Sequence, residues 1–121
     1  MFKVEADKAK NLMIMTFSGH VSAEDLKKEE ERVKALLADL QAGLKLLTDL
    51  TPLESMDPGS LSYISRNMDR LGKRGVSMVV RVIPDPHKDI GLNILSVFHY
   101  PRRTRIVTCE NMKDALAALA D

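Results

Sequence analysis

The chain has 121 residues, of which 45% are hydrophobic and 29% are charged, and its formal net charge is +1. These values predict one globular domain over residues 1–121, and the balanced charge gives no reason to expect nucleic-acid binding. The single cysteine excludes an internal disulfide, and no apolar run approaches the roughly 20 residues that span a bilayer. Because no signal-peptide organisation is present, we expect a cytoplasmic protein.

Hydrophobic periodicity changes repeatedly between two and 3.6 along the chain, so strands and helices are expected to alternate. Residues 2–6 and 12–17 predict two strands, and the second is apolar on both faces, as in a central strand. Ser22 begins a helix with a capping-box arrangement, and Gly43 ends it. Residues 44–50 form the next predicted strand.

The second half of the chain continues this alternation. Asp57 and Pro58 predict the beginning of a second helix, with Asp57 as its N-cap and Pro58 at the first helical position. The remaining predicted elements are a strand at 76–83, a helix at 89–98, a strand at 104–108 and a helix at 111–120. The order β-β-α-β-α-β-α-β-α predicts an α/β fold with a single mixed, mostly parallel sheet and helices packed on it.

The segment from Thr48 to Leu61 links the third predicted strand to the second predicted helix and reads TDLTPLESMDPGSL. It resembles the switch segment of the STAS domains, the anti-sigma-factor antagonist family, which usually reads Asp-Leu-Ser/Thr … Met-Asp-Ser-Ser/Thr-Gly-Leu. The motif match is confined to about residues 44–61, and the rest of the chain matches the SpoIIAA-like layout. Pro58 stands where the family has its phosphorylatable Ser.

The resemblance implies a non-enzymatic regulatory or protein-interaction module in bacterial signalling, to which a kinase-like or other regulatory protein docks. Asp49 would order the loop and Asp57 would cap the helix, whose positive end favours an anionic group. The expected docking residues are Asp49, Asp57, Pro58, Gly59, Ser60 and Leu61.

The standard phospho-switch is expected to be absent, because Pro58 has no hydroxyl group to accept a phosphoryl group. Ser60, read as a solvent-facing residue of the first helical turn, is the first candidate for a displaced acceptor. A phosphate there would suit the helix dipole. Ser55 in the preceding loop is the weaker candidate.

A small-ligand binding protein of the same fold is the alternative, with a lipid, a nucleotide or another anion as its ligand. His99, Tyr100 and Arg102 would lie near the pocket. If helices cover only one face of the sheet, the other face leaves apolar side chains of strand 12–17 exposed, and a homodimer or an apolar ligand would cover them.

Catalytic and metal-binding patterns are absent from the sequence. It contains no Gly-x-Ser-x-Gly, no P-loop and no Gly-x-Gly-x-x-Gly, and its three histidines have no metal-ligand spacing. The basic run at 102–105 is read as protective charge on an edge strand. We therefore expect no enzyme, no metal and no cofactor.

Overall fold

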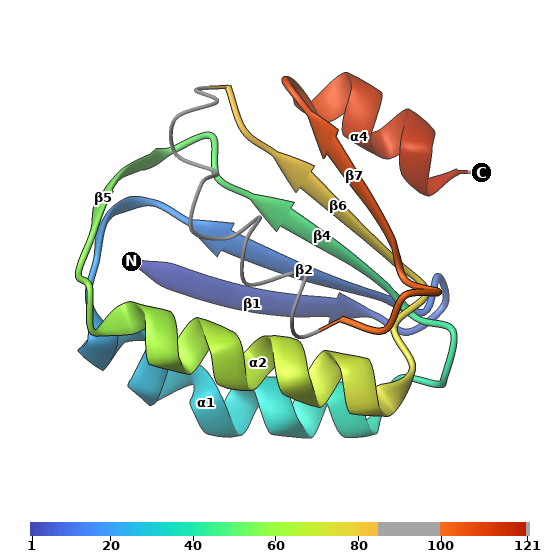
Figure 1. Ribbon diagram of the computed structural model, residues 1–121, viewed down its shortest axis with the longest axis horizontal. Coiled ribbons are helices and arrows are strands. Elements are labelled where there is room, and N and C mark those ends of the chain that lie inside the picture. Colours follow the sequence, from blue (N-terminus) through green and yellow to red (C-terminus); the bar gives the residue numbers. More distant parts are fainter. Residues whose placement is uncertain (85–99, 121) are drawn as a thin grey trace.

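The computed structural model describes residues 1–84 and 100–120, and the predicted helix at 89–98 lies outside them. Five strands form one sheet in the order β1-β2-β4-β6-β7, with β1 antiparallel to β2 and the other neighbours parallel (Figure 1). The strands are β1 (Phe2–Asp7), β2 (Leu12–Phe17), β4 (Lys45–Asp49), β6 (Met78–Val82) and β7 (Arg105–Cys109). The predicted mixed, mostly parallel α/β sheet is confirmed.

Three helices are described, namely α1 (Ala23–Ala38), α2 (Ser60–Arg74) and α4 (Met112–Leu119). Helices α1 and α2 lie side by side on one face of the sheet, and α4 lies on the other (Figure 1). The capping box predicted at Ser22 is present. The predicted end of this helix at Gly43 is wrong, because Asp39 is the C-cap and Gly43 follows in a turn at φ +90°.

The hydrophobic core has one cluster on each face of the sheet. Met13 and Met15 of β2 pack with apolar side chains of α1 and α2, whereas Leu12 packs with the cluster under α4. Full burial of such a side chain is worth about 1.5–3 kcal/mol. Helices therefore cover parts of both faces of the sheet. The sequence predicted an exposed apolar face only for helices on one face of the sheet, and this condition is not met.

Two short strands that the sequence did not predict form a second, parallel sheet. They are β3 (Gly19–Val21) and β5 (Leu53–Met56). Gly19 N–H donates to the Pro52 carbonyl at 2.8 Å, and Asp57 N–H donates to the Val21 carbonyl at 2.9 Å. Strands of three and four residues are too short to show a periodicity of two, and the pairing holds the loop before α2 against the β2–α1 connection.

This pairing also moves the beginning of α2. The helix begins at Ser60 with Gly59 as its N-cap and without a side-chain cap, so the predicted capping role of Asp57 and first helical position of Pro58 are wrong. Asp57 is held beside β3 through its backbone, and a tight turn follows in which Ser60 N–H donates to the Asp57 carbonyl at 3.0 Å.

Within the described ranges, no helix is long and apolar enough to cross a membrane.

Candidate functional site

Three polar side chains meet where the small sheet reaches the beginning of α2. His20 of β3 is the cross-strand neighbour of Ser55 in β5, after a shift of register between Gly19 and His20. Its Nδ1 lies 2.7 Å from Ser55 Oγ, and its Nε2 lies 3.0 Å from Asp57 Oδ1. We call Ser55, His20 and Asp57 the His20 cluster.

The His20 cluster is open to solvent, with the His20 side chain 54% exposed and the Asp57 side chain 44% exposed. A carboxylate accepts hydrogen bonds, so a neutral His20 carries its proton on Nε2 and directs it to Asp57. Its Nδ1 is then an acceptor, and the Ser55 hydroxyl is the donor that faces it. The arrangement places an imidazole base against an exposed serine hydroxyl.

Ser60 does not face solvent, so that part of the prediction is wrong. Its side chain is fully buried, and its hydroxyl donates to the Asp57 carbonyl at 2.6 Å. The helical pattern explains this, because Ser60 precedes the buried residues Ile64, Met68 and Leu71 by four, eight and eleven positions. Phosphorylation of Ser60 stays a prediction that would require this turn to open.

The other predicted docking residues have different surroundings. Pro58, Gly59 and Leu61 are exposed, and Leu61 is one of the exposed large apolar side chains of the described chain. Asp49 lies at the end of β4, and its Oδ1 accepts from the Thr51 N–H at 3.0 Å, in a local turn. The structure thus brings Ser55 and Asp57 together through His20, while Asp49 bonds within its own loop.

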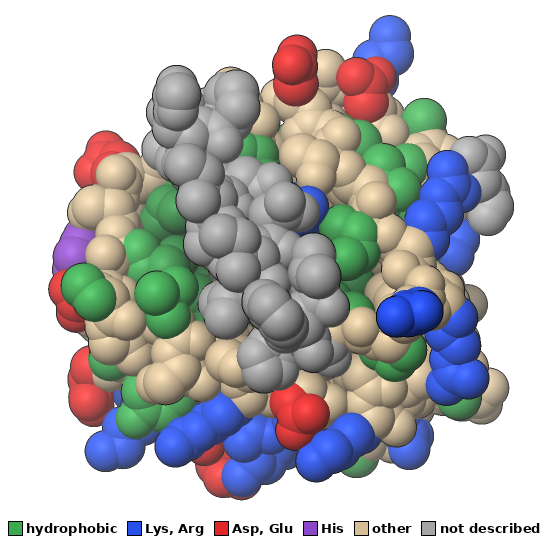
Figure 2. Space-filling model, in the orientation of Figure 1, with side chains coloured by type: hydrophobic (Ala, Val, Ile, Leu, Met, Phe, Trp, Pro, Cys, Tyr) green, Lys and Arg blue, Asp and Glu red, His purple; other side chains and the backbone are tan. Residues whose placement is uncertain are grey.

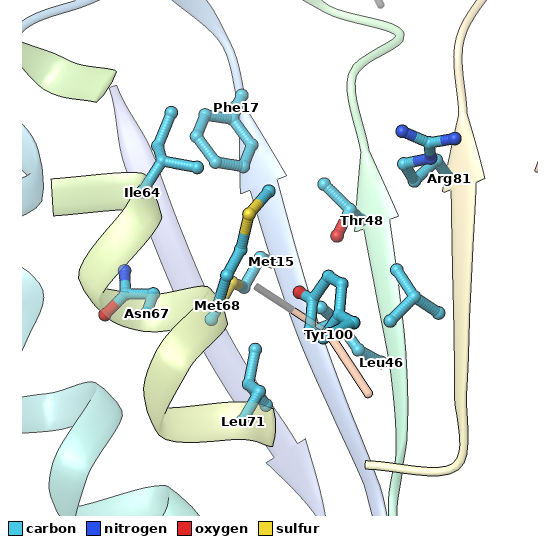
Figure 3. Close-up of a pocket in the computed structure, with 11 residues that line it drawn as sticks. Met15, Phe17, Leu46, Thr48, Ile64, Asn67, Met68, Leu71, Arg81 and Tyr100 are labelled. Atoms are coloured by element: carbon cyan, nitrogen blue, oxygen red, sulfur yellow. The ribbon is translucent and has the colours of Figure 1, made fainter. Parts of the chain in front are cut away.

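Of the predicted ligand-pocket residues, Tyr100 lines a cavity of about 30 Å³ between α2 and the sheet (Figure 3). The other polar residues that line it are Thr48, Asn67 and Arg81. Burial raises the pKa of Tyr100, and the charge of Arg81 opposes that shift in part. Arg102 is exposed and is absent from the lining, and His99 lies outside the described residues.

From the sequence, His20 is expected only as a surface loop residue, and Arg81 has no expected role in a site beyond an anion-binding patch that is the weaker of two interpretations of the basic residues. Arg81 is buried in β6, where its Nη2 donates to Thr108 Oγ1 at 2.9 Å. A single arginine inside a valine-rich strand was the available signal for this position.

Over residues 1–84 and 100–120, no group of three or more His, Cys, Asp or Glu side chains could hold a metal ion.

No family model matches the chain, and neither does any curated protein. Solved structures do match. A DUF3478-family protein of Shewanella loihica, described as uncharacterised and SpoIIAA-like in fold, aligns with a TM-score of 0.73 and 16% identity, over 98% of this chain and 92% of that chain. This chain has the SpoIIAA-like fold.

Two further structures share this SpoIIAA-like fold. An anti-sigma factor antagonist from Mycobacterium paratuberculosis aligns with a TM-score of 0.62 and 23% identity, over 100% of this chain and 94% of that chain. The Bacillus cell-fate determinant SpoIIAA in its phosphorylated form aligns with a TM-score of 0.64 and 11% identity, over 98% and 99%. At these identities the likeness establishes the fold, which is the layout that the STAS resemblance predicted.

Proposed function

We propose that the chain is a non-enzymatic, protein-binding regulatory module of bacterial signalling. Its docking surface would comprise the turn before α2 and the first helical turn, with Leu61 at its centre. The observation that carries the proposal is the exposed Leu61 side chain, 39% accessible, beside an acidic turn in a fold shared with named anti-sigma factor antagonists. Apolar surface rimmed by polar residues marks many protein-interaction sites, and Leu61 would serve as the apolar contact of such a site.

The chemistry of this surface indicates what a partner must offer. Glu54 is exposed and Asp57 partly so, and both precede the apolar Leu61 along the chain. Figure 2 shows hydrophobic and acidic side chains grouped at the end of the molecule where β5 meets α2. A kinase-like or other regulatory protein with an apolar pocket and a basic rim would complement it.

Pro58 leads us to propose that the standard phospho-switch is absent. The residue at this position has no hydroxyl group, so a partner that depends on a phosphoryl group there would find no acceptor. Docking would then rest on the shape and charge of the turn.

An affinity capture from source-cell lysate tests this docking surface. Leu61→Asp should abolish capture of a specific partner, and the loss should recur with the purified partner by calorimetry. Leu116→Asp is the matched control, because Leu116 is 55% exposed on α4, on the opposite face of the sheet. Equal capture by the two variants would contradict the proposal, and thermal unfolding of both would show that each is folded.

The small-ligand alternative rests on the cavity beside Tyr100, whose lining combines apolar side chains with Thr48, Asn67 and Arg81. Its volume of about 30 Å³ suits one or two water molecules. Ligand pockets for drug-sized molecules occupy about 300–1,000 Å³, so we place this function second. A thermal-shift screen tests it, since a ligand at 100 times its Kd stabilises by about 2.7 kcal/mol.

A further inference from the structure

We propose that a second copy of this chain binds the docking surface. The acidic turn before α2 and Leu61 of one copy would lie in a groove between the C-terminal parts of α1 and α2 of the next copy. We call it the α1–α2 groove. The inference rests on the proposed docking surface and goes beyond it by naming an occupant. The groove is lined by Lys34, Leu37, Ala38, Arg70, Lys73 and Arg74.

The α1–α2 groove has the chemistry that the docking surface requires of a partner. Its volume is about 430 Å³, within the range of about 300–1,000 Å³ that ligand pockets occupy. Four of its six lining residues are basic, while Leu37, Ala38 and the stems of the basic side chains contribute apolar surface. Figure 2 shows Lys and Arg side chains along the side of the molecule where α1 and α2 lie. The groove thus combines apolar surface with a basic rim.

The charges of the groove are available to a partner. The Lys73 side chain is 79% exposed, and its pair with Asp69 is a surface pair of little strength, so the ammonium can turn to another carboxylate. Arg74 donates to backbone carbonyls and has no carboxylate partner in the described part of the chain. The formal net charge of +1 gives little repulsion between copies.

The docking surface offers the opposite charge. Glu54 is exposed and forms no ion pair with any residue that the structure describes, and Asp57 follows it three positions later. Acidic groups beside the apolar Leu61 therefore match basic groups beside Leu37 and Ala38. Such complementarity steers association and selects one relative orientation of two molecules.

The two surfaces lie at opposite ends of the helical layer. A Cβ added to Gly59 would lie 3.7 Å from Ala23 Cβ, and one added to Gly75 would lie 3.3 Å from Ala42 Cβ, so α1 and α2 run in the same direction. Leu61 precedes the α2 residues of the groove by 9 to 13 positions, or about 14–20 Å of helix.

A copy therefore cannot fill its own groove with its own turn. The contact joins two different surfaces, so it is heterologous, and its repetition gives a ring or an open chain. It uses helical surfaces and not the apolar side chains of β2 from which the sequence predicted a homodimer.

Mixing two purified variants tests the head-to-tail contact. Leu61→Asp breaks the docking surface and keeps the groove, whereas Ala38→Glu places a carboxylate in the groove and keeps the docking surface; both positions are exposed. In sedimentation equilibrium, the mass of wild type should rise with concentration, and each variant should stay monomeric. An equimolar mixture should double the monomer mass and go no further, because two such variants share one intact contact.

A second pair of variants changes charge alone. Glu54→Lys and Lys73→Glu, both at exposed positions, should each associate more weakly than wild type and should also form a dimer when mixed. The association should weaken as NaCl rises from about 0.1 M to about 1 M, because the Debye length shortens from about 10 Å to about 3 Å. Leu116→Asp, on the opposite face of the sheet, is the control and should associate as wild type does.

Two results would overturn the proposal. One is a wild type that stays monomeric at concentrations up to about 1 mM, the weak end of the affinity scale. The other is a wild type that associates while both mixtures of folded variants, checked by thermal unfolding, stay monomeric. Because sedimentation uses this chain alone, its failure would leave the docking of another protein standing. A failed capture from lysate would leave the self-association standing.

Discussion

The hydroxyl of Ser60 donates a hydrogen bond to the backbone carbonyl of Asp57, 2.6 Å away, inside the protein. The Ser60 N–H donates to the same carbonyl at 3.0 Å, so one oxygen receives both donors at the beginning of α2. The bond joins the turn that carries the docking surface to the first residue of the helix. Ser60 therefore supports the shape of this surface from beneath.

Substitution of Ser60 should lower the free energy of unfolding, and a charged replacement should lower it more than an apolar one. Ser60→Ala loses one hydrogen bond and should lower the free energy of unfolding by about 1 kcal/mol. Ser60→Glu places a carboxylate in a fully buried position and should cost at least about 3 kcal/mol. Urea unfolding measures both values. The exposed control Ser62→Glu should change stability by less than about 1 kcal/mol, because its charge suits the helix N-terminus.

The two glycines that flank α2 should respond differently to alanine. Gly75, the C-cap, has φ +92°, and an added Cβ would lie 3.3 Å from Ala42 Cβ. Gly75→Ala should therefore cost about 1–2 kcal/mol. Gly59 has φ −64° and would place a Cβ 3.7 Å from Ala23 Cβ, an ordinary contact, so Gly59→Ala should stay within about 0.5 kcal/mol. Equal losses in denaturant unfolding would contradict this account.

Arg74 ties the end of α1 to the end of α2. Its Nε donates to the Leu40 carbonyl at 3.0 Å, and its Nη2 donates to the Leu40 and Ala38 carbonyls. Arg74→Met keeps an apolar stem but loses these charge-assisted bonds, and should cost about 1–2 kcal/mol in chemical denaturation.

Lys73→Met is the matched control for Arg74→Met. The Lys73 ammonium lies 3.1 Å from Asp69, but both side chains are largely exposed. Such a surface pair contributes about 0–1 kcal/mol, and we expect a loss of no more than about 0.5 kcal/mol. Comparable losses of unfolding free energy in the two variants would show that the hydrogen bonds from Arg74 to the carbonyls do not stabilise the protein more than a surface ion pair does.

The elements that could be predicted from sequence are those whose signals are local. Residues 12–17 show their strand character within six positions, and the Ser22 cap lies three residues from its partner Asp25. The beginning of α2 was misplaced for the opposite reason. Asp57 has the sequence of an N-cap, but its backbone bonds to Val21 of β3, and this tertiary contact overrides the local preference.

The same distinction explains the candidate site. Leu61 and Asp57 were proposed from the sequence because they lie in one motif, whereas His20 is separated by 35 residues from Ser55 and by 37 from Asp57. Only the pairing of β3 with β5 brings these side chains together, and neither strand is long enough to be read from the sequence. Burial of Ser60 could have been predicted, since it continues the apolar stripe of α2 by one turn.

The capping box of α1 should make stability depend on acid. The Ser22 N–H donates to Asp25 Oδ2 at 2.9 Å, and this bond lowers the pKa of Asp25, with smaller help from the Ser22 hydroxyl and the N-terminal ammonium. Because the folded pKa lies below the unfolded value, the unfolded chain binds more protons. The contribution of Asp25 is then complete above about pH 4 and is lost as the pH falls through the folded pKa.

Asp25→Asn tests this account through a comparison of two pH values. The variant cannot ionise, so the difference in unfolding free energy between wild type and variant should be largest near neutral pH and should shrink below about pH 4. Denaturant unfolding at each pH measures it, with Asp39→Asn as the control. Asp39 lies 3.4 Å from Lys8 in an exposed ion pair, so its substitution should change the free energy of unfolding by no more than about 1 kcal/mol. A wild-type-to-Asp25→Asn difference that is the same at both pH values would show that ionisation of Asp25 does not stabilise α1.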